Sequence, residues 1–149
     1  MVSQYLSRWH GMSSRERWAF LASLVLLPLY WLGLRVLGLR RLQAWLERFP
    51  VAVGSPMDPM ETARIGTAVN SAARFTPGPV TCLTRSLLLR WLLCRMGTVS
   101  ALRIGVRIEE GELFAHAWVE QNGIPVNDRP EVVARYAAFD HPVAPENFS

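Results

Sequence analysis

The hydrophobic period of this chain changes once, at Gly97, and that change limits what the chain can fold into. Before Gly97, apolar residues recur mostly at helical spacing. After it, every second residue is apolar, which is the period of a strand: Leu102, Ile104, Val106 and Ile108. Helices followed by neighbouring strands predict an α+β fold, with a helical N-terminal part and an antiparallel β-meander packed on it.

Two apolar helices are expected in the first fifty residues. Ser13, followed three residues later by Glu16, matches a capping box, so a helix should begin near residue 14. Pro28 should end it, because proline lacks an amide proton and clashes with the preceding turn. Amphipathic spacing then predicts a second helix over 29–49, which Pro50 stops.

Two further helices carry clear start signals. Asp58, with Pro59 in the first helical position, should cap a helix that runs to Phe75. Thr81 should cap the next helix, CLTRSLLLRWLLCRM, and Gly97 ends it. The stretch PVAVGSP, between the second and third helices, is expected to be a loop.

The chain of 149 residues is expected to form a single domain, 1–149. Within it, residues 1–50 supply the apolar N-terminal helices and residues 58–149 the remaining core. Residues 18–34 run without a charge, and as a helix they would reach about 25 Å, less than the ~30 Å of a hydrocarbon layer. For residues 18–34 we favour a helix that is buried in the core or docked on a partner. A helix at a membrane interface and a helix that spans a membrane remain alternatives. The flanking residues do not form a signal peptide.

Charge is unevenly divided. All sixteen basic residues are arginine, which excludes lysine Schiff-base chemistry. Residues 1–108 carry fourteen arginines against four acids, whereas 109–149 carry two against eight. Such a basic body attracts an acidic peptide or an anionic membrane surface. Because basic and aromatic residues do not interleave as in nucleic-acid-binding motifs, no nucleic acid partner is expected.

The two cysteines have different expected environments. On one helix, Cys82 and Cys94 would lie about 18 Å apart, too far for a disulfide, which suits a reducing cytoplasm. Cys82 directly follows the Thr81 cap, where unpaired N–H groups and the helix dipole favour a thiolate. Cys94, near the helix C-terminus, is expected to pack in the core.

The stretch FAHAWVEQNGIPVND predicts a strand with His116, a hairpin turn and a short third strand over 124–128 with Asp128, and a weak helical stretch is expected over 132–138. If residues 121–123 form a three-residue loop, His116 stands directly opposite Asp128, with Cβ atoms about 5 Å apart. A two-residue Asn122-Gly123 turn would instead shift the pair to a diagonal. In direct opposition the carboxylate can bond one imidazole nitrogen, and the other nitrogen is free to take a proton from a thiol. We therefore predict a Cys82–His116–Asp128 triad.

Three neighbours are weaker candidates for substrate binding. Arg85 and Ser86 lie one turn after Cys82, where they either shape the pocket or serve solvation and close packing. Trp118 shares the strand face of His116 and either walls the cleft or is a core aromatic. No paired ligand motif predicts a metal site.

The segments TCLTRSLLLRWLL, SALRIGVR, FAHAWVE and GIPVND, in this order, resemble the transglutaminase-like cysteine protease domain of lasso-peptide biosynthesis. Within that family, the chain resembles the stand-alone leader peptidase. This peptidase corresponds to the C-terminal half of the B protein in systems where the B protein is split into two chains. The resemblance implies a transglutaminase-like or papain-like core over 58–149, with the catalytic Cys at a helix N-terminus. The family's triad falls on Cys82, His116 and Asp128.

The same resemblance implies a peptidase that removes the leader from a ribosomally made lasso-peptide precursor, without a cofactor. Implied partners are the precursor's leader, a small leader-recognition protein and an ATP-dependent lasso cyclase. A cytoplasmic location is expected, with membrane association through the N-terminal helices left open. Two alternatives remain: a transglutaminase-like amidase or acyltransferase, and a non-catalytic scaffold docked to a membrane or complex.

Overall fold

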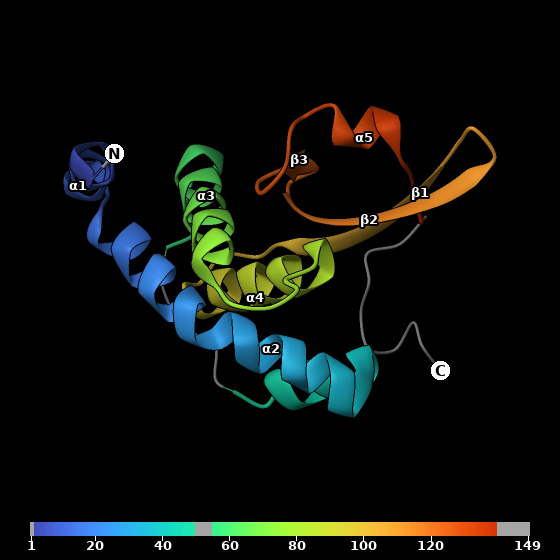
Figure 1. The fold of residues 1–149 in the computed structure, drawn as a ribbon, viewed down its shortest axis with the longest axis horizontal. Coiled ribbons are helices and arrows are strands. Elements are labelled where there is room, and N and C mark those ends of the chain that lie inside the picture. The colour runs from blue at the N-terminus through green and yellow to red at the C-terminus, as the bar shows by residue number, and fades with distance from the viewer. Residues whose placement is uncertain (1, 50–54, 140–149) are drawn as a thin grey trace.

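Helices come first and strands second in the computed structural model, which describes residues 2–49 and 55–139 (Figure 1). The long helices are α1 (Val2–Gly11), α2 (Ser14–Leu46), α3 (Pro59–Phe75) and α4 (Cys82–Arg95). The strands are β1 (Ala101–Glu109), β2 (Glu112–Gln121), β3 (Ile124–Pro125) and β4 (Ala137–Ala138), with the short helix α5 (Val132–Arg135) before β4. The predicted α+β class is confirmed. The expected loop over 50–56 lies mostly outside the described residues.

The predicted N-terminal caps fix where three helices begin. Ser13, Asp58 and Thr81 precede α2, α3 and α4, and the side-chain oxygen of each accepts a hydrogen bond from the backbone N–H three residues later. The donor–acceptor distances are 3.2, 2.8 and 3.2 Å. These bonds satisfy amide groups that have no partner inside the helix, so local sequence alone sets these starts.

The expected helix break at Pro28 is wrong, because the backbone leaves helical geometry at Gly38, where φ is +77°. Pro28 stays inside α2, whose residues on both sides of it, such as Leu27 and Tyr30, are buried against the core. Glycine reaches positive φ without a steric penalty. Beyond Gly38 the chain folds back so far that a Cβ added at Gly33 would lie 2.9 Å from Leu42 Cδ1.

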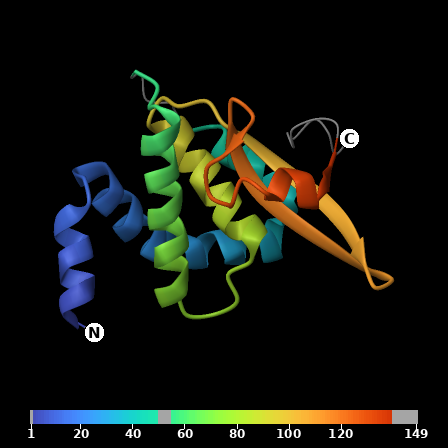
Figure 2. The same cartoon turned by 90° about the horizontal axis from the view of Figure 1, so that it is seen from above.

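The core forms where α4 packs between α2 and the sheet (Figures 1 and 2). Helix α3 packs beside both α2 and α4. The apolar residues of α4 that are buried in this layer are Leu87, Leu88, Leu89, Leu92 and Leu93. Helix α4 is therefore held from both sides, and its N-terminus has a fixed position relative to β2.

The antiparallel sheet has the strand order β3-β2-β1-β4. Its long pair is β1 with β2, joined by a two-residue turn at Glu110 and Gly111, both with positive φ. The expected third strand over 124–128 is shorter, since β3 ends at Pro125. The helical stretch expected over 132–138 is also shorter: α5 ends at Arg135 and the chain then pairs with β1 as β4.

Helix α2 is long and apolar enough to cross a membrane, judged by length and composition alone, and only 17% of its most apolar window is buried. The sequence-based preference for a buried helix therefore holds for one face only. That face includes Ala19, Ser23, Leu27 and Tyr30, all at most 4% exposed.

Tyr30 provides a test of this packing. Its side chain is 4% exposed, and its hydroxyl has no hydrogen-bond partner among the described residues. Burial raises the pKa of the Tyr30 phenol above its usual range, and the nearby Arg95 opposes this only in part. The folded protein thus holds the phenol proton to higher pH than the unfolded chain, whose tyrosine titrates near ~10. This contribution to stability is complete below about pH 10 and is lost as the pH rises further.

We expect Tyr30→Phe to leave the free energy of unfolding at neutral pH unchanged or to raise it by about 1 kcal/mol, because an unpaired buried hydroxyl is removed. The loss of stability above about pH 10 should also become less steep. Urea unfolding of both proteins across this pH range measures both effects. A clear destabilisation at neutral pH would mean that the hydroxyl has a partner in the folded state.

Candidate active site

The structure brings His116 and Asp128 together. Nε2 of His116 and Oδ2 of Asp128 form a hydrogen bond, and the two side chains are 22% and 28% exposed. The other imidazole nitrogen, Nδ1, is therefore the one available for exchanging a proton with another group. An imidazole oriented by a carboxylate is the arrangement that general acid–base catalysis uses.

The route by which Asp128 reaches His116 differs from the favoured prediction. Glu120 pairs with Pro125 and Gln121 with Ile124, so the hairpin has the two-residue turn Asn122-Gly123. Both turn residues have positive φ, 51° and 79°, as tight hairpin turns require. The predicted three-residue loop, and with it the direct strand opposition, is wrong. Asp128 instead lies on a segment that leaves the sheet after Pro125.

Asn127 fixes the path of that segment. Its Oδ1 accepts a hydrogen bond from the backbone N–H of Val119 at 2.8 Å, and its Nδ2 donates to Oγ of Ser86 at 3.0 Å. Its backbone carbonyl accepts from Nδ2 of Asn70 at 2.9 Å. The residue before Asp128 is thus tied to β2, α4 and α3 together. Sequence reasoning missed Asn127, because nothing in the local pattern distinguishes it from a turn residue.

Close approach of α3 holds the same segment from the other side. A Cβ added at Gly66 would lie 2.2 Å from the carbonyl oxygen of Val126 and 3.2 Å from Cα of Asn127. Only glycine allows α3 to approach this closely. The position of Asp128 therefore depends on contacts from three different elements as well as on the turn.

Cys82 is the first residue of α4 and is partly buried. Ser86, one turn later on the same helix face, is fully buried and donates a hydrogen bond to the carbonyl of Ala117 at 3.2 Å. Ala117 is the strand neighbour of His116, so α4 at Ser86, one turn after Cys82, runs alongside the strand that carries the imidazole. Among the residues described, the Cys82 sulfur has no hydrogen bond, to His116 or to any other group.

Aromatic rings surround the imidazole. Trp118 is fully buried, and its ring is stacked with His116 at a centroid separation of 6.1 Å. Its Nε1 donates to Glu120 at 2.8 Å. The ring of Tyr136, a residue that the sequence analysis did not single out, has its centroid 5.1 Å from that of the His116 ring. Trp118 is therefore a core aromatic that packs on the imidazole, and its expected role as a wall of the substrate cleft stays a prediction.

Gly105 makes room for these rings. It faces His116 across the β1–β2 pair, and an added Cβ would lie 2.9 Å from atoms of both Trp118 and Tyr136. A larger residue would push the rings off the imidazole. This position, too, could have been recognised from the sequence only as a glycine inside a strand, which often marks a close approach.

A groove of about 480 Å³ opens beside Asp128. Arg85 and Arg129 line it, together with Thr67 and Asn70 of α3. Of the two weaker candidates on α4, Arg85 therefore borders this groove, whereas Ser86 is a buried link between α4, β2 and Asn127. The groove is polar and offers two guanidinium groups.

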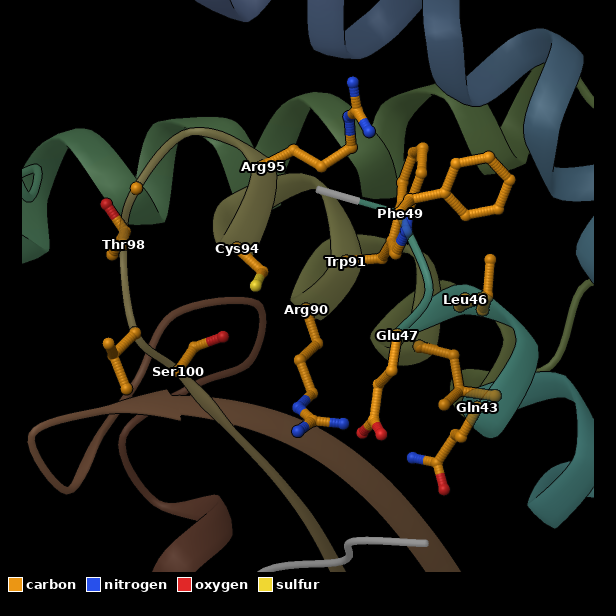
Figure 3. Close-up of a pocket in the computed structure, with 13 residues that line it drawn as sticks. Gln43, Leu46, Glu47, Phe49, Arg90, Trp91, Cys94, Arg95, Thr98 and Ser100 are labelled. Atoms are coloured by element: carbon orange, nitrogen blue, oxygen red, sulfur yellow. The ribbon is translucent and has the colours of Figure 1, made fainter. Parts of the chain in front are cut away.

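A second cavity, of about 260 Å³, lies at the other end of α4 (Figure 3). Cys94 lines it and is exposed, so the expected core position of Cys94 is wrong. The last turn of α4 lines this cavity together with the end of α2 and the loop at 97–100, so Cys94 faces a cavity where a core position was expected. This cavity is separate from the His116–Asp128 pair.

Within 2–49 and 55–139, no three His, Cys, Asp or Glu side chains gather as ligands for a metal ion.

A scan against protein-family models matches the transglutaminase-like superfamily over residues 23–139. The matched range contains α3, α4 and all four strands, and with them Cys82, His116 and Asp128. Comparisons with curated proteins and with solved structures find no match.

Asn127→Ala should test what holds Asp128 in place. It leaves the Val119 N–H without its acceptor and removes the bond to Ser86, so we expect a loss of about 2–4 kcal/mol in the free energy of unfolding. Asn70→Ala removes only one bond, to the Asn127 carbonyl, and should cost about 1 kcal/mol. Urea unfolding compares the two variants. Equal losses would contradict the central position of Asn127.

Proposed function

The chain belongs to the transglutaminase-like superfamily, and on that premise we propose that it is a cysteine peptidase that removes the leader from a lasso-peptide precursor. The proposed catalytic residues are Cys82, His116 and Asp128. The superfamily supports cysteine-based acyl chemistry in general; the peptidase reaction, the triad and the lasso-peptide substrate are our proposal.

One observation supports the proposal: His116 is hydrogen-bonded to Asp128 and lies on β2, which packs against α4, the helix that begins at Cys82. The pairing uses Nε2, which leaves Nδ1 for the thiol. The hydrogen bond from Ser86 to Ala117 ties the part of α4 one turn after Cys82 to the strand that carries His116. The proposed proton transfer requires the Cys82 thiol to come within hydrogen-bond reach of Nδ1.

In the first half of the proposed reaction, Nδ1 of His116 takes the Cys82 thiol proton, and Asp128 stabilises the resulting imidazolium. The thiolate attacks the carbonyl carbon of the leader–core junction. The Cys82 backbone N–H, which has no partner inside the helix, donates to the developing oxyanion. The C–N bond then breaks, and His116 returns the proton to the departing amine of the core peptide.

In the second half, the leader is held on Cys82 as a thioester. His116 takes a proton from water, and the resulting hydroxide attacks the thioester carbonyl. The C–S bond breaks, the leader leaves with a free carboxylate, and Cys82 recovers its proton. Residues of this chain carry every proton transfer, so the proposed cycle needs no cofactor.

The polar groove beside Asp128 is the proposed substrate-binding surface. Arg85 and Arg129 line it, and guanidinium groups favour acidic side chains and peptide carbonyls. Trp118 contributes indirectly, by packing on the imidazole. The proposed partners are the leader region of the precursor, a separate leader-recognition protein and an ATP-dependent lasso cyclase that takes the released core peptide. Because the precursor is made on ribosomes, the proposed site of action is the cytoplasm.

Cleavage of a precursor tests the proposal directly. Cys82→Ala, His116→Ala and Asp128→Ala should each abolish or greatly slow release of the leader, and the first two should lower the rate by at least about a thousandfold. Because a triad acts as a unit, the double variant of Cys82 and His116 should be no slower than either single variant. Cys94→Ala is the matched control and should cleave at the wild-type rate. Mass spectrometry of precursor mixed with this protein, with and without the leader-recognition protein, provides the measurement.

The products also separate the alternatives. Hydrolysis of the peptide bond gives two fragments whose summed mass exceeds the precursor by one water. A transferase would join an amine to the substrate, and a side-chain amidase would leave the backbone intact. If Cys82→Ala cleaves as fast as the wild type, the cysteine mechanism is wrong.

Alkylation rates separate an enzyme from a scaffold. Cys94 is the more exposed thiol, so accessibility alone would make it react first with iodoacetamide. The proposed His116 partner and the helix N-terminus both favour a thiolate at Cys82, so we expect Cys82 to react faster at neutral pH. His116→Ala should slow Cys82 and leave Cys94 unchanged. Peptide mapping after brief alkylation reports both rates; faster reaction of Cys94 would favour the scaffold.

A further inference from the structure

An exposed apolar stripe runs along α2 on the face turned away from the core. Its six residues are between 49% and 69% exposed: Trp18, Leu21, Val25, Leu29, Leu32 and Val36. At 100° per residue they fall within about 80° of arc. Single exposed apolar residues are ordinary on a soluble protein, but a continuous stripe over about five helical turns indicates a surface that something covers.

The opposite face of α2 is fully engaged. Ala19, Ser23, Leu27 and Tyr30 are buried, and this face packs on α3 and α4. The helix is therefore apolar on both faces, with protein on one side only. A helix held in this way cannot be surrounded by lipid, so α2 does not span a bilayer while this fold is intact.

Arginines border the stripe. Arg17 and Arg35 are eighteen residues apart, which is five full turns, so they lie at the same angle on one side of it. Arg15 borders the other side. Across residues 1–49, seven arginines stand against two glutamates, and one of these, Glu16, is buried. The surface around the stripe is thus basic, which is complementary to anionic lipid headgroups.

The spacing of the stripe fits a flat surface better than another helix. The separations are 3, 4, 4, 3 and 4 residues, so the pattern repeats after eleven residues, with 18, 21 and 25 matching 29, 32 and 36. Eleven residues in three turns is 3.67 per turn, close to the 3.6 of a straight helix. A seven-residue repeat begun at Trp18 would instead use Pro28 and Arg35 as seam positions, which a coiled coil disfavours.

We propose that α2 lies flat on an anionic lipid surface, with the stripe in the acyl boundary and the exposed Arg35 extended to the headgroups. Beside the stripe, Arg15 pairs with Glu61, and Arg17 donates to the backbone carbonyls of Trp9 and His10. Trp18, at the start of the stripe, has the amphipathic ring that prefers the membrane interface. Because α4 lies between α2 and the sheet, this orientation leaves the sheet, which includes β2, on the far side of the helical layer from the lipid (Figures 1 and 2). The inference does not depend on the proposed peptidase reaction.

Co-sedimentation of the full chain with vesicles tests the proposal. Binding to an equimolar mixture of phosphatidylcholine and phosphatidylglycerol should be at least about tenfold tighter than to phosphatidylcholine alone, and it should weaken as salt is raised. The triple variant Leu21→Gln, Val25→Gln, Leu32→Gln should bind at least about tenfold more weakly. Since all three side chains are exposed, its thermal unfolding should match that of the wild type.

The matched control is Ile108→Gln with Leu113→Gln, which changes two even more exposed apolar residues at the tip of the β1–β2 pair. This control should bind the mixed vesicles like the wild type. Arg35→Gln should lower affinity for the anionic vesicles and leave the weak binding to phosphatidylcholine unchanged.

Three outcomes would overturn the proposal: no binding to anionic vesicles, equal loss of binding in the triple variant and the control, or self-association in solution that the triple variant abolishes without any vesicle binding. The last result would assign the stripe to a second copy of this chain. Analytical ultracentrifugation of the same samples detects it.

Discussion

Asn127 is the contact on which the candidate site depends. Its side chain joins the Val119 amide of β2 to Ser86 of α4, and its carbonyl receives Asn70 of α3. These three elements belong to distant parts of the chain, so Asn127 can make its bonds only when the helical layer and the sheet are already docked. The next residue is Asp128, whose pairing with His116 is therefore a consequence of tertiary packing. The hairpin by itself would leave the carboxylate on a diagonal.

Two glycines play the complementary part. Gly66 lets α3 approach the segment before Asp128, and Gly105 lets Trp118 and Tyr136 reach the imidazole. The hydrogen bonds of Asn127 hold the segment before Asp128 in place, and the absence of a side chain at the two glycines allows the neighbouring backbone and rings to approach. Because protein interiors are close-packed, a single methyl group at either position must displace backbone or ring atoms.

Local signals explain what the sequence could predict. Side-chain caps and the change of period at Gly97 act within a few residues, so the helix starts, the α+β class and the location of Cys82 at a helix N-terminus followed from them. What failed depended on contacts between distant segments. Packing kept Pro28 inside α2, pairing with β1 turned residues 137–138 into a strand, and the turn Asn122-Gly123 was one of two that the sequence allowed. The contact between His116 and Asp128 was expected, but the geometry that produces it was not.

The reversal at Gly38 has a consequence for how this chain can vary. In a straight helix, one inserted residue rotates every later side chain by about 100° relative to the earlier ones. Here the first arm carries the outward stripe and the second carries Gln43 and Leu46 along a cavity wall, with a non-helical residue between them. The rotation of side chains around the axis of one arm is therefore not carried over to the other arm across that residue. A change of length in one arm therefore does not by itself rotate the side chains of the other, and the close contact of Gly33 with Leu42 sets how the two arms meet.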